Sequence, residues 1–127
     1  MSVKILVVDD DADIRDILKL TLSEENYEVL EAQDGEEALE KILADAPHLM
    51  ILDLGLPKKD GYEVCHVLKT DARFNKFKDL PIVLLTASKE MKSISHGMGL
   101  GAVAYLQKPF QPEMLLGVIR GFVGSHE

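Results

Sequence analysis

The segment KILVVDDDADIR, Lys4–Arg15, joins an apolar run directly to three consecutive aspartates. The run from Val3 to Val8 is rich in β-branched residues and too short for a helix, which predicts a strand buried on both faces. After the aspartates, apolar residues recur at spacings of three and four, which predicts an amphipathic helix. Asp11 or Asp13 is expected to cap this helix. The segment therefore predicts one strand-to-helix unit with carboxylates at the junction.

The same alternation of strand and helix continues to the end of the chain. Further strands are expected at Tyr27–Ala32, His48–Asp53, Pro81–Thr86 and Ala102–Leu106, and helices at Gly35–Leu43, Tyr62–Lys69, Lys89–Met98 and Pro112–Val123. Alternating strands and helices predict an α/β fold with a parallel sheet covered on both sides. A closed barrel needs roughly 200 residues or more, so the 127 residues favour the open form. We expect a doubly wound, five-stranded sheet of order 2-1-3-4-5, flavodoxin-like, with five helices.

Composition and charge exclude several classes of function. The net charge of −8 argues against direct binding of nucleic acid or anionic membranes, since both need a basic surface. The single cysteine, Cys65, has no partner for an internal disulfide, and no secretory signal or membrane span is evident. We expect a soluble, cytoplasmic protein of one domain, 1–127, without membrane insertion.

Polar side chains gather where the predicted strands end. The first strand leads into Asp9 and Asp10, the third ends at Asp53, the fourth at Thr86, and the fifth is followed by Lys108. Ligands of open α/β sheets bind beyond the carboxyl ends of the strands. If the first and third strands are neighbours, their aspartates share one pocket, and three anions oppose folding unless a cation joins them. Oxygen ligands favour Mg²⁺ over zinc.

The other groups suggest a reason for the metal. Lys108 offers a compact positive charge suited to a phosphate oxygen, and Thr86 offers a hydroxyl donor. Asp53 is the best-placed carboxylate nucleophile. The sequence therefore predicts in-line phosphoryl transfer to Asp53, with Mg²⁺ and Lys108 stabilising the charge that develops on phosphate oxygens.

Four separated motifs, LVVDDD, LDLGLPKKDG, LLTAS and GAVAYLQKPF, occur in order along the chain. Together they resemble the receiver domain of two-component response regulators, including the single-domain chemotaxis type. The resemblance spans nearly the whole chain. It implies that Asp53 is the phosphoacceptor, and that Asp10, Asp53 and the carbonyl of Gly55 bind Mg²⁺ directly while Asp9 acts largely through water.

The resemblance also implies a switch and partners. Lys108 would pair with the phosphoryl group, and Thr86 and Tyr105 would form the switch that reshapes a protein-binding face. The phosphoryl donor would be a histidine kinase or a histidine phosphotransfer protein, and the output a downstream effector protein. Such a domain is a monomer or a phosphorylation-dependent dimer, and it catalyses only its own phosphotransfer and dephosphorylation.

Two other functions compete with this interpretation. A pseudo-receiver would be a constitutive protein-interaction module with a vestigial acidic pocket, but the set of Asp9, Asp10, Asp53, Thr86 and Lys108 is intact. A phosphatase with an aspartyl-phosphate intermediate usually carries D-x-D at its first strand, with the nucleophile there. In ILDLG, Gly55 stands where a second aspartate would be.

Two residues near the third helix have simpler interpretations. Gly61 is expected to serve the turn before that helix. Cys65 is adjacent to His66, but neighbours in sequence point about 100° apart on a helix. A buried structural cysteine is therefore favoured over a reactive thiol.

Overall fold

The computed structural model describes residues 3–54, 61–86, 99 and 102–123. The strands are β1 (Lys4–Val8), β2 (Glu28–Ala32), β3 (Leu49–Asp53), β4 (Ile82–Thr86) and β5 (Ala104–Gln107). The helices are α1 (Ala12–Ser23), α2 (Gly35–Asp45), α3 (Gly61–Thr70), the 3-10 helix η1 (Ala72–Phe77) and α5 (Pro112–Val123). All strands are parallel and form one sheet of order β2-β1-β3-β4-β5, so the predicted topology is confirmed. The predicted helix at Lys89–Met98 lies outside the described residues.

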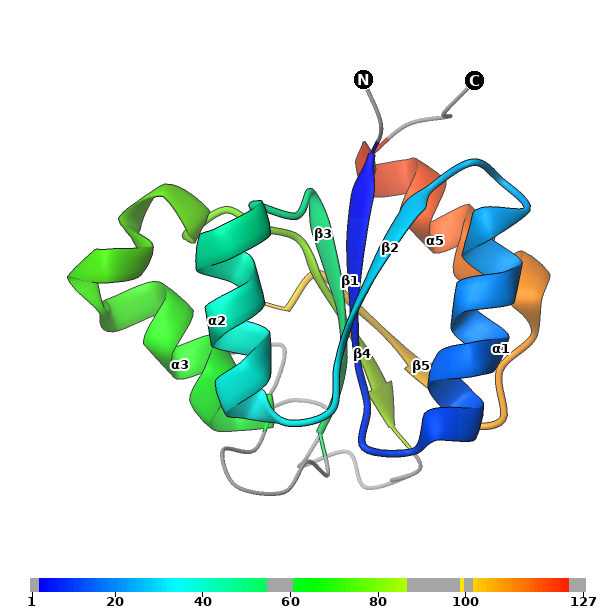
Figure 1. The fold of residues 1–127 in the computed structure, drawn as a ribbon, viewed down its shortest axis with the longest axis horizontal. Coiled ribbons are helices and arrows are strands. Elements are labelled where there is room, and N and C mark those ends of the chain that lie inside the picture. The colour runs from blue at the N-terminus through cyan, green and yellow to red at the C-terminus, as the bar shows by residue number, and fades with distance from the viewer. Residues whose placement is uncertain (1–2, 55–60, 87–98, 100–101, 124–127) are drawn as a thin grey trace.

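The helices lie on two faces of the sheet, as Figure 1 shows: α2, α3 and η1 cover one face, and α1 and α5 cover the other. Because the strands are parallel, their carboxyl ends meet at one edge, the lower edge in this view. Within the described part of the chain, no helix is long and apolar enough to cross a bilayer.

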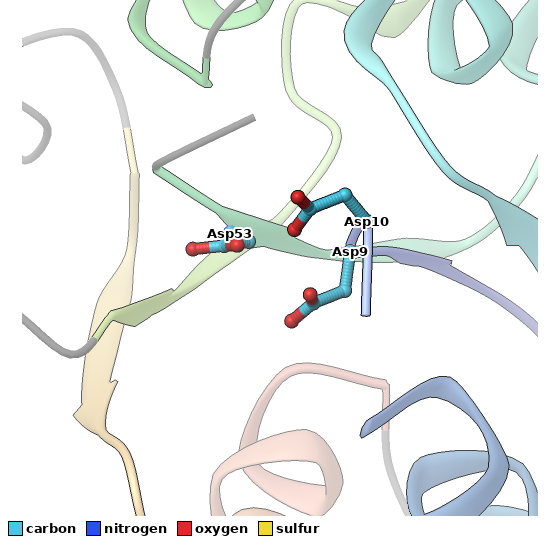
Figure 2. Close-up of side chains that lie close together, drawn as sticks. All are labelled: Asp9, Asp10 and Asp53. Atoms are coloured by element: carbon cyan, nitrogen blue, oxygen red, sulfur yellow. The ribbon is translucent and has the colours of Figure 1, made fainter. Parts of the chain in front are cut away.

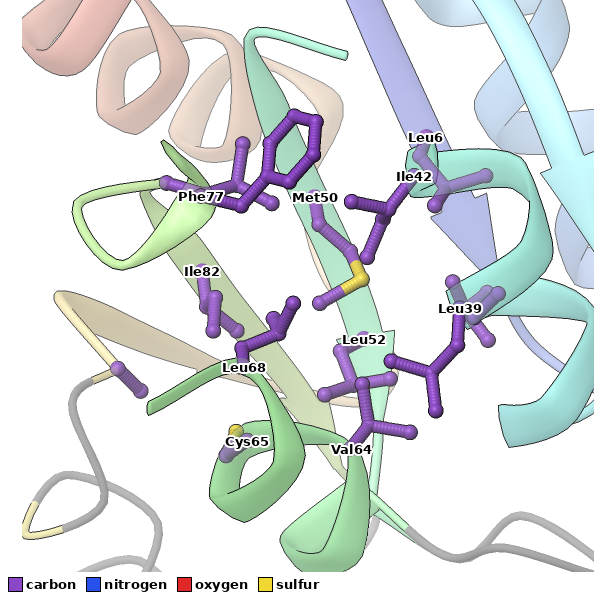
Figure 3. Close-up of a cluster of buried hydrophobic side chains, with 14 of the residues drawn as sticks. Leu6, Leu39, Ile42, Met50, Leu52, Val64, Cys65, Leu68, Phe77 and Ile82 are labelled. Atoms are coloured by element: carbon purple, nitrogen blue, oxygen red, sulfur yellow. The ribbon is translucent and has the colours of Figure 1, made fainter. Parts of the chain in front are cut away.

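Successive residues of each strand alternate between two separate cores. Leu6 and Val8 face a core under α2, α3 and η1, whereas Ile5 and Val7 face a core under α1 and α5. Figure 3 shows part of the first core, in which Met50 and Leu52 of β3 pack among side chains of α2 and α3. Both faces of β1, β3 and β4 are thus buried, which explains their unbroken apolar sequences.

The register of β1 against β3 positions the aspartates. The last paired residues are Val8 and Leu52, so Asp9 and Asp53 stand one step further along the two strands. The backbone N–H of Asp9 still donates to the carbonyl of Ala32 in β2, at 3.2 Å. The junction that follows β1 is therefore an extension of the sheet.

Local signals fix the start of α1 as predicted. Asp11 is the N-cap, and its side chain accepts a hydrogen bond from the backbone N–H of Asp13 at 2.9 Å. Leu18 and Leu22 are fully buried, whereas Ile17 at the border of the apolar stripe is half exposed. The sequence did not predict η1, which buries Phe74 and Phe77 three residues apart.

Candidate functional site

Three carboxylates meet where β1 and β3 end. One oxygen from each of Asp9, Asp10 and Asp53 lies within 4.8 Å of the other two. Asp9 and Asp53 are buried, with 1% and 8% of their surface exposed, whereas Asp10 is exposed. Figure 2 shows Asp9 and Asp10 from the end of β1 facing the same space as Asp53 from β3. Sequence reasoning therefore named residues that the fold brings together.

The side chain of Lys108 contacts this cluster. Its Nζ donates to Asp9 Oδ2 at 2.8 Å and lies 3.4 Å from Asp53 Oδ2. The backbone N–H of Lys108 donates to the carbonyl of Thr86 at 2.8 Å, which ties the segment after β5 to the end of β4. Burial alone lowers the pKa of Lys108, but the hydrogen bond to Asp9 and the charges of Asp53 and Asp9 outweigh it and leave the pKa raised. Lys108 therefore remains a cation across the neutral range.

Asp9 is held at four separate points. Its N–H donates to Ala32, its Oδ1 accepts from the N–H of Asp11 at 3.0 Å, and its Oδ2 accepts from Lys108. Its backbone carbonyl accepts from Nη1 of Arg15 at 2.7 Å. The buried carboxylate is thus compensated by hydrogen bonds and by an opposite charge, as burial of an ion requires.

Arg15 is a residue near the site that sequence reasoning missed. Besides its bond to Asp9, its Nε lies 3.4 Å from Glu31 Oε1 on β2, and its side chain is only 17% exposed. In the helical pattern Arg15 belonged to the polar positions between apolar residues, where a charge normally faces solvent. The sequence carried no signal that separated it from Lys19.

Gly61 touches the backbone that carries the predicted nucleophile. A Cβ at this position would lie 2.9 Å from the carbonyl oxygen of Asp53 and 3.0 Å from Cα of Leu54. The residue therefore does more than serve a turn, because its lack of a side chain lets α3 begin against the end of β3. Cys65, also on α3, is fully buried in the core, as predicted.

Thr86 and Tyr105 lie on neighbouring strands. Thr86 pairs with Gln107 and Leu84 with Tyr105, so the side chains of Thr86 and Tyr105 share one face of the sheet. Thr86 is 3% exposed and Tyr105 is 41% exposed. An open hollow of about 450 Å³ adjoins the tyrosine and is lined by Tyr105, Leu106, Gln107, Pro109, Phe110, Gln111 and Met114. Gly55, whose carbonyl was a predicted metal ligand, lies outside the described residues.

The charges that the described residues bring to this site do not cancel. Among the described residues, three carboxylates lie together with the ammonium group of Lys108, and the ligand atoms that the three aspartates offer are hard oxygens. Such a cluster favours a hard divalent cation and a group whose own oxygens can complete its coordination.

Comparison with known proteins points to a single family. The family model for the response regulator receiver domain matches residues 5–120. The chain is 45% identical over 117 residues to a probable transcriptional regulator, ycf27, of Porphyridium aerugineum, covering 92% of this chain and 46% of that protein. It thus spans about half the length of the curated relatives it matches.

Solved structures give the same result over nearly the whole of this chain. A putative response regulator from Chloroflexus aurantiacus superposes with a TM-score of 0.88 at 36% identity, covering 97% of this chain and 98% of that one. The chemotaxis protein CheY4 of Vibrio cholerae gives 0.85 at 34% identity, covering 96% and 99%. The matched family is not one of classical enzymes. The chain, with its pocket of Asp9, Asp10 and Asp53, belongs to the response regulator receiver domain family.

Proposed function

We propose that this domain accepts a phosphoryl group on Asp53 from a phosphohistidine of a histidine kinase or a histidine phosphotransfer protein. The observation that carries the proposal is the placement of Lys108, whose Nζ lies between the carboxylates of Asp9 and Asp53 while Asp10 lies within 4.8 Å of both. A nucleophilic carboxylate, an adjacent cation and two further carboxylates are the groups that such a transfer requires.

The residues fit Mg²⁺. Asp10 and Asp53 would bind it directly, together with the carbonyl of Gly55, and Asp9 would act largely through water. The exposed position of Asp10 and the buried position of Asp53 leave one side of the cluster open to solvent, and Mg²⁺ usually keeps several of its waters in such sites. When bound, the ion supplies neutralisation of charge on the phosphate oxygens.

The transfer itself uses the side chains of this chain. An Oδ atom of Asp53 attacks phosphorus, the P–N bond to the donor imidazole breaks, and a P–O bond to Asp53 forms. The electron pair of the broken bond leaves with the imidazole. Lys108, already 3.4 Å from Asp53, stabilises the oxygens of the transferred group.

Thr86 and Tyr105 would convert this event into a change of surface. The buried Thr86 hydroxyl would turn toward the phosphoryl group, and the half-exposed Tyr105 ring would fill the space beside it. Both side chains share one face of the sheet, which supports this movement. The changed surface around β5 and α5 would then bind a downstream effector protein or a second copy.

Intact mass spectrometry after incubation with Mg²⁺ and acetyl phosphate tests the proposal without a partner protein. Wild type is expected to gain the mass of one phosphoryl group, and Asp53→Asn is expected to gain none. Asp16→Asn, which removes an exposed carboxylate from α1, is the matched control and should behave like wild type. No gain in wild type would favour a pseudo-receiver, and rapid turnover of many phosphate esters would favour a phosphatase.

A further inference from the structure

We infer that Arg15 is a positioning residue for the phosphorylation site: it fixes the peptide group that joins Asp9 to Asp10 and so sets the direction of the Asp10 carboxylate. This inference rests on the proposed function, since it concerns how the same site is held ready for its metal.

Arg15 contacts the Asp9 peptide group directly. Nη1 of Arg15 donates to the backbone carbonyl of Asp9 at 2.7 Å, and the bond is partly buried. A peptide group is planar, so holding the carbonyl of Asp9 also fixes the direction in which Cα of Asp10 leaves it. Asp10 is exposed, and burial therefore does little to restrain its side chain. The hold on the preceding carbonyl supplies a restraint that packing does not.

Arg15 is itself anchored at two further points. Its backbone N–H donates to the carbonyl of Asp11 at 3.1 Å, which roots it in the first turn of α1. Its Nε meets Glu31 Oε1 at 3.4 Å, and Glu31 projects from β2. The guanidinium thus bridges α1, β2 and the junction after β1. A partly buried charge with two fixed acceptors has little freedom to move.

Arginine suits this place better than lysine. Its planar group presents separate donors in a rigid fork, so Nη1 can hold the Asp9 carbonyl while Nε faces Glu31. A single ammonium nitrogen lacks that fixed geometry. Lys19 shows the contrast, because its Nζ lies 3.6 Å from the same Glu31 but its side chain is 57% exposed.

The expected consequence is a defect in metal affinity. Residues that orient metal ligands from the next layer typically change affinity or activity about 10- to 100-fold when replaced. Arg15→Met keeps a long, unbranched side chain but removes every hydrogen-bond donor of the guanidinium group. We expect Arg15→Met to weaken Mg²⁺ binding about tenfold, and to slow phosphorylation by acetyl phosphate by a similar factor when Mg²⁺ is limiting. Saturating Mg²⁺ should restore most of the rate.

Calorimetric titration with MgCl₂ and phosphorylation by acetyl phosphate at low and high Mg²⁺ test this. Acetyl phosphate needs no protein docking, so an effect of Arg15 on partner recognition cannot contribute. Lys19→Met is the matched control, since it removes a cation from the same helix and from the same Glu31, and it should stay within about twofold of wild type. Arg15→Lys should be intermediate.

The outcomes separate the two proposals. If wild type neither binds Mg²⁺ nor accepts a phosphoryl group, the proposed function fails and this inference fails with it. If wild type is active and folded Arg15→Met matches it at limiting Mg²⁺, only the inference is overturned. A rate loss in Arg15→Met that saturating Mg²⁺ leaves unchanged also overturns it. Should Arg15→Met not fold, Glu31→Gln is expected to show the same magnesium-dependent loss at smaller size, and wild-type behaviour there contradicts the inference.

Discussion

Replacing Asp10 by asparagine should stabilise the metal-free domain. One carboxylate oxygen from each of Asp9, Asp10 and Asp53 lies within 4.8 Å of the other two. The Asp10→Asn substitution would remove one charge from this cluster and leave a side chain of nearly the same size. Two charges at that distance repel by about 1 kcal/mol at the dielectric constant of water and by about 3.5 kcal/mol at an effective value of 20.

Because Asp10 is exposed to solvent, the repulsion between the carboxylates is nearer the value of about 1 kcal/mol for water. Two repulsions of about 1 kcal/mol each set the upper limit of the gain, and solvent screening at the exposed Asp10 lowers it. We therefore expect the free energy of unfolding in EDTA to rise by about 1 kcal/mol, and the gain to shrink in high salt because exposed charges are screened.

Magnesium should reverse the order of stability. When the Mg²⁺ concentration is ten times its Kd, the free energy of unfolding of wild type is expected to rise by about 1.4 kcal/mol, whereas that of Asp10→Asn should rise much less. Urea denaturation of both proteins, in EDTA and in MgCl₂, measures the four values. Asp16→Asn controls for the change in net charge and should not reproduce the effect.

Two results would refute this reasoning. Asp10→Asn could be no more stable than wild type in EDTA, which would mean that the three carboxylates do not repel each other in the folded state. Alternatively, Asp10→Asn could be stabilised by Mg²⁺ as much as wild type, which would remove Asp10 from the metal site.

Three further outcomes are expected. Gly61→Ala should lower the free energy of unfolding, measured in urea, by about 1–3 kcal/mol and should slow phosphorylation, because the new Cβ would lie 2.9 Å from the carbonyl oxygen of Asp53. An unchanged stability and an unchanged rate would contradict the close approach. Ala46→Gly should raise the free energy of unfolding by about 0.5–1 kcal/mol, because Ala46 has a φ of 48°, which favours glycine. Asn26→Gly should raise it less, because Asn26, at φ 64°, is a residue type that tolerates this region. An equal gain in both variants would argue against the backbone explanation. Burial raises the pKa of the Cys65 thiol from 9.0 to about 11, against a smaller lowering by Lys69, so its thiolate fraction at pH 8 should be about a hundredfold below that of an ordinary thiol. Native protein should therefore react with a thiol reagent far more slowly than protein in urea, and equal rates would show that the core opens.

The topology and much of the site could be predicted from sequence because both depend on short-range patterns. Unbroken apolar runs marked the buried strands, and Asp9 and Asp53 stood at their ends, where a parallel sheet places its ligands. Lys108 followed the fifth strand and lies against both of them. The roles assigned to these residues remain predictions.

What the sequence did not show depends on contacts between distant segments. The partnership of Arg15 with Glu31 joins residues sixteen apart on different elements, and the helical pattern gives Arg15 the appearance of a surface charge. The close approach of Gly61 to Asp53 likewise needs the packed backbone. The helix η1 is too short for a periodic signal, although Asp71 as its N-cap and the spacing of Phe74 and Phe77 mark it in retrospect.

The position of β2 at the outside of the sheet has a consequence for behaviour at high concentration. An outer strand offers unpaired backbone groups to any other extended chain, and proteins guard against such sheet-to-sheet addition with charges on that strand. β2 carries Glu28 and Glu31 in its five residues. These two charges are of the kind that discourage a further strand from pairing with an outer one, so replacing both by apolar residues is expected to promote association through this edge of the sheet.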